Sequence, residues 1–231
     1  MRRTNRDRDP DQGDEFLSRL LREGVAAGEI ANELLSEFQQ GYPISKLRIL
    51  LGASNLEAVA AGVWIASELG SSARPVFNEI AGLLHSPSAR VRFFALDSIH
   101  SCARPEDENE IRGALDLVED REPSVRWKAL VFLATLPVAV VRAARQAAAK
   151  SAPNSACARG LKLLESSGAR DAAEIAHGLA DRDIVLRRYA AAAAARVADR
   201  DPGPLRLAMK SEDETIRQFA EDMAARAGVA E

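Results

Sequence analysis

The apolar residues of this chain recur at helical spacing. From Phe16 onward they fall three and four residues apart, and no segment alternates apolar and polar residues over the length of a strand. The clearest copies share one short pattern: an apolar anchor residue, an arginine, two variable residues and an alanine. The anchors of these four copies are Val91, Val125, Leu186 and Ile216. The pattern predicts a chain made almost entirely of helices.

Two weaker copies, anchored at Val59 and Ala156, fill the gaps in the series. The six anchors are then 30 to 34 residues apart. A period in this range is typical of solenoids, in which each unit buries its apolar face against its neighbours. We predict an all-α, right-handed α-solenoid of about six helical hairpins, each made of a first helix, a short turn and a second helix.

A small polar residue stands five positions before every anchor. Serine and aspartate side chains accept hydrogen bonds from the unpaired N–H groups at a helix start, so these residues are expected to cap the second helices. Glycines that tolerate a left-handed backbone are expected to end second helices at Gly70, Gly168 and Gly228. The six expected capping residues are Ser54, Ser86, Asp120, Ser151, Asp181 and Ser211.

The N-terminal part of the chain differs from the repeats. Residues 1–13 hold arginines balanced by aspartates and almost no apolar residues, which predicts a disordered tail. Residues 14–42 have apolar residues at helical spacing before a Gly-Tyr-Pro stop, which predicts a pair of capping helices. Residues 43–231 form the repeat array, and we expect the array and its cap to make a single domain.

Four segments carry a resemblance to a known family of repeats. Residues 83–99, 117–133, 179–193 and 208–223 resemble HEAT-like repeats, in the short bacterial form found in phycobilin-lyase-type proteins. In the fourth repeat Cys157 and Gly160 stand where the pattern has arginine and alanine, so the structural ladder typical of such repeats is expected to be interrupted there. The resemblance implies a structural ladder along the stack, formed by Arg92, Arg126, Arg187, Arg217, Asp120 and Asp181.

The bulk composition limits the classes of partner. Hydrophobic residues make up 47% of the chain and charged residues 28%, enough for a continuous core with a solvated surface. The formal net charge of −3 gives no global basic field to attract nucleic acid or an anionic membrane. Cys102 and Cys157 lack metal-ligand spacing and are expected to be reduced packing residues, as in a cytoplasmic protein. The start of the chain does not read as a secretion signal, no apolar run is long enough to cross a bilayer, and the alanine and arginine content favours a bacterial source.

Counting from the anchors predicts which residues face a partner. Positions two, six and nine after each anchor point away from the buried stripe, and in HEAT-like arrays that side lines the concave surface. Phe93 and Trp127 would then lie side by side on adjacent repeats as an aromatic hot spot. The alternative, equally open from the sequence, is that both aromatics lean onto neighbouring helices and complete the core. The candidate partner-binding residues are Phe93, Trp127, Asp97, His100, Lys128, Val131, Glu68 and Arg188.

Residues able to perform chemistry are sparse and scattered. The three histidines lie in three different repeats without a second ligand at metal spacing, so no metal site is expected. Nucleophile-elbow, phosphate-loop and dinucleotide motifs do not occur, so no cofactor is expected. Asp97 and His100 share one helix face, but such pairs are mostly surface hydrogen bonds. The sequence predicts a protein that is not an enzyme.

These observations favour a monomeric, cytoplasmic scaffold for protein–protein interaction that holds another protein on its concave face. Small acidic HEAT-like proteins resemble known immunity families, which implies a toxin as partner and toxin neutralisation as the role. One alternative is a HEAT-like DNA-binding protein or alkylpurine DNA glycosylase, although the acidic balance argues against a surface that grips phosphates. Another is an assembly factor or tetrapyrrole-lyase accessory protein, which would carry a chromophore.

Overall fold

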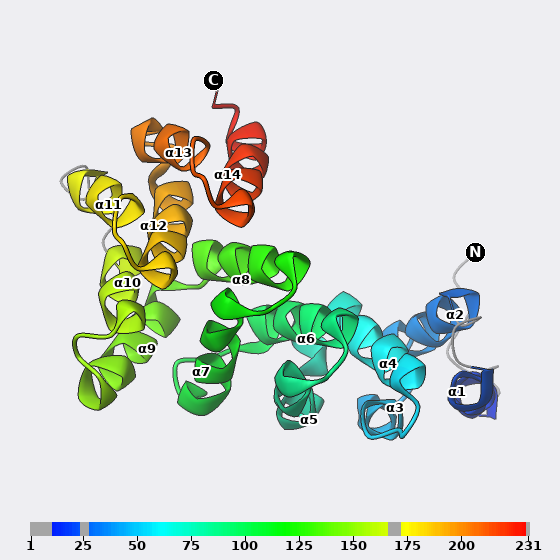
Figure 1. Cartoon of the computed structure of the whole chain (residues 1–231). Coiled ribbons are helices and arrows are strands. Elements are labelled where there is room, and N and C mark those ends of the chain that lie inside the picture. Colours follow the sequence, from blue (N-terminus) through cyan, green and yellow to red (C-terminus); the bar gives the residue numbers. More distant parts are fainter. Residues whose placement is uncertain (1–10, 24–27, 166–171, 230–231) are drawn as a thin grey trace. The chain divides into compact units, whose positions relative to one another are not determined.

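The computed structural model describes residues 11–23, 28–165 and 172–229, and within these ranges every regular element is a helix. The helical repeat fold predicted from the apolar spacing is therefore confirmed (Figure 1). Residues 1–10 of the predicted tail and the predicted helix end at Gly168 lie outside the described residues. The contacts divide the chain into an N-terminal unit, Met1–Cys102, and a C-terminal unit, Ala103–Glu231, and each is considered by itself below.

In the N-terminal unit, a helical pair is followed by two hairpins. α1 packs on α2, α2 packs on α4, and α4 packs on α6, so the second helices stack in chain order as a solenoid requires. Gly70, at a φ of 55°, ends α4 as predicted. The elements of this unit are α1 (Asp11–Glu23), α2 (Gly28–Gln39), η2 (Ile44–Lys46), α3 (Leu47–Leu51), α4 (Leu56–Leu69), η3 (Gly70–Val76), α5 (Phe77–Gly82), η4 (Leu83–His85) and α6 (Ala89–Cys102).

Helix α1 begins at Asp11, so residues 11–13, which the charge pattern assigned to the tail, are helical. A Cβ atom on Gly13 would lie 2.6 Å from the ring of Tyr42, so only glycine lets that ring pack directly on the helix. The Tyr42 hydroxyl donates a hydrogen bond to Asp14, and Lys46 Nζ lies 2.9 Å from the same carboxylate. The start of α1 is thus fastened to Tyr42 in the loop that precedes the repeats and to Lys46 at their beginning.

The C-terminal unit contains four more hairpins, which with those of the N-terminal unit make the six that the period predicts. In each hairpin the first helix contacts the second. Gly228, at a φ of 66°, ends the last helix as expected. The elements are α7 (Glu108–Asp116), η5 (Leu117–Glu119), α8 (Pro123–Thr135), α9 (Val138–Ser151), α10 (Ala156–Glu165), α11 (Ala172–Leu179), α12 (Ile184–Val197), α13 (Gly203–Ala208) and α14 (Glu214–Ala227).

The second helices of the C-terminal unit do not stack in simple chain order. α12 contacts α8, α10 and α14, and α8 also contacts α14. The expectation that each repeat packs only on its immediate neighbours is therefore wrong for α8. The run Ala190–Ala194 on α12 is at most 1% exposed, and its small side chains let several helices approach closely. This alanine run forms the centre of the unit.

The predictions that Ser54 and Ser151 cap second helices are wrong, because Asn55 caps α4 and Ser151 is the last residue of α9. In the other four repeats, the polar residues five before the anchors lie two residues before the helix cap. Their side chains accept hydrogen bonds from the N–H group two residues on, as in the 2.8 Å bond from Asp183 N to Asp181 Oδ1. The residue that donates this N–H group lies at the start of the helix: Asp183 caps α12 and Asp213 caps α14. In these four repeats the cap is thus two residues later than predicted, because the turn itself needs one side-chain bond before the helix begins. The same two-residue bond is made by Ser86, Asp120 and Ser211.

The arginine after the anchor holds its own turn together. In four repeats its Nη1 donates to the carbonyl oxygen of the residue five before the anchor, at 2.8 to 3.1 Å. These bonds run within one repeat, which differs from the expected ladder between repeats but confirms a structural role. In addition, Arg126 Nε lies 3.2 Å from Thr215 Oγ1 on α14. The arginines concerned are Arg92, Arg126, Arg187 and Arg217.

The fourth repeat departs from the pattern for a packing reason. α10 begins at Ala156, whereas the other arginine-bearing helices begin two residues before their anchor, so Ala158 takes the anchor position and Arg159 the arginine position. Cys157 Sγ lies 3.3 Å from the Tyr189 hydroxyl, and a Cβ on Gly160 would lie within 2.8 Å of three Tyr189 side-chain atoms. The irregular residues therefore make room for the fully buried ring of Tyr189.

Candidate partner-binding surface

The predicted surface residues are divided between the two units. Glu68 on α4 and Phe93, Asp97 and His100 on α6 belong to the N-terminal unit. The proximity of Phe93 and Trp127 involves both units and stays a prediction. The remaining candidates, which belong to the C-terminal unit, are Trp127, Lys128 and Val131 on α8 and Arg188 on α12.

In the N-terminal unit, counting from the anchors identifies exposed positions only in part. Glu68 is exposed, whereas Phe93, Asp97 and His100 are half-buried. The Phe93 ring packs edge-on against Phe94, with 5.5 Å between ring centroids. On α4 the equivalent columns are occupied by Ala61 and Ile65, which are buried. The columns are therefore not a continuous surface here.

In the C-terminal unit, Arg188 has an internal position. Its side chain is 12% exposed; Nη2 lies 3.0 Å from Asp213 Oδ2, and Nη1 donates to the Val118 carbonyl at 2.6 Å. Burial alone raises the pKa of Asp213, but the charge of Arg188 and hydrogen bonds, including those from the Ile216 and Thr215 amides, hold it below its ordinary value. Arg188 thus fastens α12 to η5 and to the capped start of α14. Trp127, Lys128 and Val131 are half-buried on α8.

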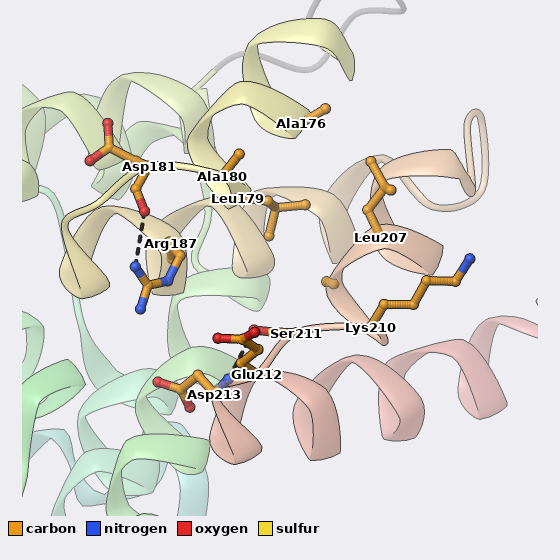
Figure 2. A pocket seen from close by; sticks show the side chains of 11 residues that line it. Ala176, Leu179, Ala180, Asp181, Arg187, Leu207, Lys210, Ser211, Glu212 and Asp213 are labelled. Atoms are coloured by element: carbon orange, nitrogen blue, oxygen red, sulfur yellow. Dashed lines mark hydrogen bonds between the residues drawn. The ribbon is translucent and has the colours of Figure 1, made fainter.

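The C-terminal unit also has two open grooves at the edge formed by the turns. The C-terminal groove, of 480 Å³, lies between the α11–α12 turn and the α13–α14 turn, as Figure 2 shows. The middle groove, of 470 Å³, lies between α10 and α11. Asp181 lines both, so the two grooves adjoin. Counting from the anchors missed them, because that count follows the second helices and these grooves are built from turns and first helices.

The charges around Asp181 are already paired. Its carboxylate accepts a hydrogen bond from Asp183 N at 2.8 Å and one from Arg159 Nη1 at 3.3 Å. The hydrogen bond from the Asp183 amide, helped by the charge of Arg159, holds the pKa of Asp181 below its ordinary value. Arg187 crosses the start of the same turn, with Nη1 bonded to the Asp181 carbonyl at 2.9 Å. The turn edge is therefore a rigid, hydrogen-bonded structure.

A smaller cavity of 170 Å³ lies beside Cys157, between α7, α9 and α10. Burial raises the pKa of the Cys157 thiol, which keeps it protonated at neutral pH. This environment suits a packing cysteine. Among the described residues, no group of three or more histidine, cysteine or acidic side chains is placed to hold a metal ion.

The helices of the described residues are all shorter than a membrane span, which needs about 20 apolar residues. No single helix there is long and apolar enough to cross a bilayer; the consecutive helices α8 and α9, bent by 109°, reach that length and composition only as a pair.

Comparisons with known proteins support the fold and do not identify a function. No protein-family model matches the chain, and no curated protein matches it. Two engineered proteins solved by the Northeast Structural Genomics Consortium are similar over 94% of this chain. The first has 15% sequence identity and a TM-score of 0.53, and 96% of its own length is covered. The second has 14% sequence identity and a TM-score of 0.50, and 68% of its own length is covered.

A designed armadillo repeat protein, solved in complex with the peptide (KR)4, has 16% identity and a TM-score of 0.48, with 94% of this chain and 98% of that one covered. The described residues form only helices, arranged in six hairpins, and the two engineered structures share this fold. The chain is a helical repeat protein of the α-solenoid class.

Proposed function

We propose that this protein is a non-enzymatic scaffold that binds another protein along the turn edge of its C-terminal unit. The observation that carries the proposal is the pair of adjoining grooves that share Asp181. Grooves that repeat along an array accept consecutive side chains of a polypeptide. The rigid turns between them, held by Arg187 and Asp181, need no reordering on binding, which lowers the entropic cost of association.

Five arginines of this unit are already paired inside it, which favours a protein partner over nucleic acid. A surface that binds DNA needs many cationic groups available to phosphates. Here Arg159 and Arg188 are paired with aspartates, and Arg142 and Arg145 both pair with Glu165. Arg196 donates to three backbone carbonyls at the end of α8, at 2.8 to 3.2 Å. These groups are already used inside the unit.

The most specific form of the proposal is a cytoplasmic immunity protein of bacteria whose partner is a toxin. Its support is the resemblance to small acidic HEAT-like proteins together with the net charge of −3. If the adjacent gene encodes a protein that stops growth when expressed alone, co-expression of this chain should restore growth. Unchanged toxicity at equal expression would remove the immunity role and leave the scaffold role standing.

Affinity capture from the cells that encode the protein tests the scaffold role. The whole chain is compared with Leu207→Ser, which alters an exposed leucine of the C-terminal groove, and with Leu56→Ser, its match on α4. These leucines are 51% and 46% exposed, so neither variant should unfold the chain. We expect one protein to be retained by the wild type and Leu56→Ser and lost with Leu207→Ser. Retention of no protein beyond a resin control would contradict the proposal, and DNA in its place would favour the DNA-binding alternative.

A further inference from the structure

The C-terminal groove has an apolar floor in a charged rim. Leu179 of α11 and Leu207 of α13 both line it, with Ala176 and Ala180 beside them (Figure 2). Leu207 is 51% exposed, whereas most of the large apolar side chains of this unit are buried. An exposed leucine above a small apolar floor is a site where one aliphatic side chain gains by burial. The floor therefore favours a partner that offers a leucine, isoleucine or valine.

Arg187 presents an oriented guanidinium at the wall of this groove. Its Nη1 is held by the carbonyls of Asp181 and Arg182, at 2.9 and 3.1 Å. Within the described residues Nε and Nη2 make no hydrogen bond, whereas Nε of the equivalent Arg126 is bonded to Thr215. A guanidinium fixed on one edge offers the other edge to a carboxylate without losing further freedom. The wall therefore favours an acidic ligand.

The balance of lining charges points in the same direction. Two of the three carboxylates at the groove are neutralised from outside it, because Asp181 pairs with Arg159 and Asp213 pairs with Arg188. The charges left to face a ligand are those of Arg187 and Lys210 against that of Glu212. The groove is thus locally cationic although the whole chain carries a net charge of −3.

From these observations we infer that the C-terminal groove takes a short acidic-aliphatic segment of the partner protein. An aliphatic side chain packs between Leu179 and Leu207, and acidic side chains next to it pair with Arg187 on one side and with Lys210 on the other. This inference rests on the proposed scaffold function and names the chemistry that the scaffold recognises. It also predicts weaker binding at high salt, since the charge pairs lie at the surface.

A fluorescein-labelled peptide, Gly-Ser-Leu-Asp-Glu-Leu-Ser-Gly, is the direct probe, with fluorescence anisotropy as the readout. A second peptide carries Asn-Gln in place of Asp-Glu, and a third carries Lys-Lys. With the full-length wild-type chain, we expect the acidic peptide to bind at least roughly fivefold more tightly than the neutral one, and the basic peptide to bind most weakly. Equal or reversed affinities would overturn the inference.

Variants locate the binding to this groove. Lys210→Glu should weaken the acidic peptide roughly fivefold, whereas Lys150→Glu, an equal charge change at an exposed position on α9, should leave its affinity unchanged. Leu207→Ser should weaken binding roughly tenfold and Leu56→Ser should not. Equal effects of the two charge variants, or of the two serine variants, would overturn the inference.

The two proposals fail in different ways. A protein captured from cells whose retention is the same for the wild type, Lys210→Glu and Leu207→Ser would refute this groove as the recognition site and leave protein binding itself intact. Absence of any captured protein would refute the scaffold function. Absence of binding by all three peptides would overturn only the inference about the acidic-aliphatic segment.

Discussion

Replacing Gly160 by alanine should destabilise the C-terminal unit, although alanine is the better helix former. Alanine in a helix interior is favoured over glycine by about 0.8–1.0 kcal/mol. The new Cβ would, however, lie within 2.8 Å of three Tyr189 side-chain atoms, where carbon atoms normally stay about 3.5–4.0 Å apart. The Tyr189 atoms concerned include Cβ and Cγ, which cannot swing away without moving α12. Overpacking of this kind costs about 1–3 kcal/mol and occasionally more.

The contacts with Tyr189 Cβ and Cγ are the shortest and put the clash at the upper end of that range, so the net expectation, after the gain in helix propensity is subtracted, is a loss of about 2 kcal/mol in the free energy of unfolding. Urea unfolding followed by circular dichroism measures it, with tryptophan fluorescence, which includes Trp127 of the same unit, as a second probe. Gly82→Ala is the matched control, since a Cβ there meets nothing within 4 Å and the backbone is already helical at a φ of −58°. The control should be neutral or more stable than the wild type. A Gly160→Ala chain as stable as the control would refute the packing account of the fourth repeat.

Three further predictions concern hydrogen bonds of the C-terminal unit. Arg126→Ala removes three hydrogen bonds and should lower the free energy of unfolding in urea by about 2–3 kcal/mol. Arg217→Ala removes one hydrogen bond and should lower it by about 1 kcal/mol. A larger loss for Arg217→Ala than for Arg126→Ala would contradict the account of the turns. Arg188→Ala leaves Asp213, 11% exposed, without its cation and should cost about 3 kcal/mol, more than Arg159→Ala, whose pair with Asp181 is more exposed. Because the pKa of Asp213 is lowered in the folded state, its contribution to stability is complete above its unfolded pKa of about 3.9 and is lost as the pH falls through the folded pKa. The stability difference between the wild type and Asp213→Asn should therefore narrow below about pH 4 in acid unfolding, and a constant difference would contradict the assignment.

The repeat pattern predicted the class of fold and the number of hairpins because both depend on local spacing. An arginine one residue after an apolar anchor, and a small polar residue five before it, stabilise one turn within one repeat. Such bonds involve neighbours in sequence, so the pattern records them directly. The caps were placed two residues early because serine and aspartate serve both as turn acceptors and as helix caps.

Features that depend on distant repeats could not be predicted in this way. The contact of α8 with α12 follows from the alanine run Ala190–Ala194, but small side chains only permit close approach and do not name the helix that approaches. Arg188 stood in a column expected to face a partner, and the bond to Val118 that makes it internal joins residues 70 positions apart. Tyr189 explains Cys157 and Gly160 only when α10 and α12 are seen together.

The sequence predicted that the candidate site binds a protein, but it did not predict the grooves proposed as its location. The expectation of a surface that binds a protein rests on the repeat architecture, and its location at the grooves of the C-terminal unit is our proposal. Leu207 was the available signal in the sequence, since it is an apolar residue between Arg206 and Ala208 on a short first helix. The counting rule followed only the second helices, so it passed over this residue.

Photo-crosslinking from the C-terminal groove tests the central claim most directly. A photoreactive phenylalanine analogue is placed at Leu207 and, in a separate chain, at Leu56, and each chain is irradiated in the cells that encode the protein. The account predicts that one protein is crosslinked from position 207 and not from position 56, and that adding Lys210→Glu reduces this product. Crosslinking of the same protein from both positions, or only from position 56, would contradict the claim that the turn edge of the C-terminal unit binds the partner.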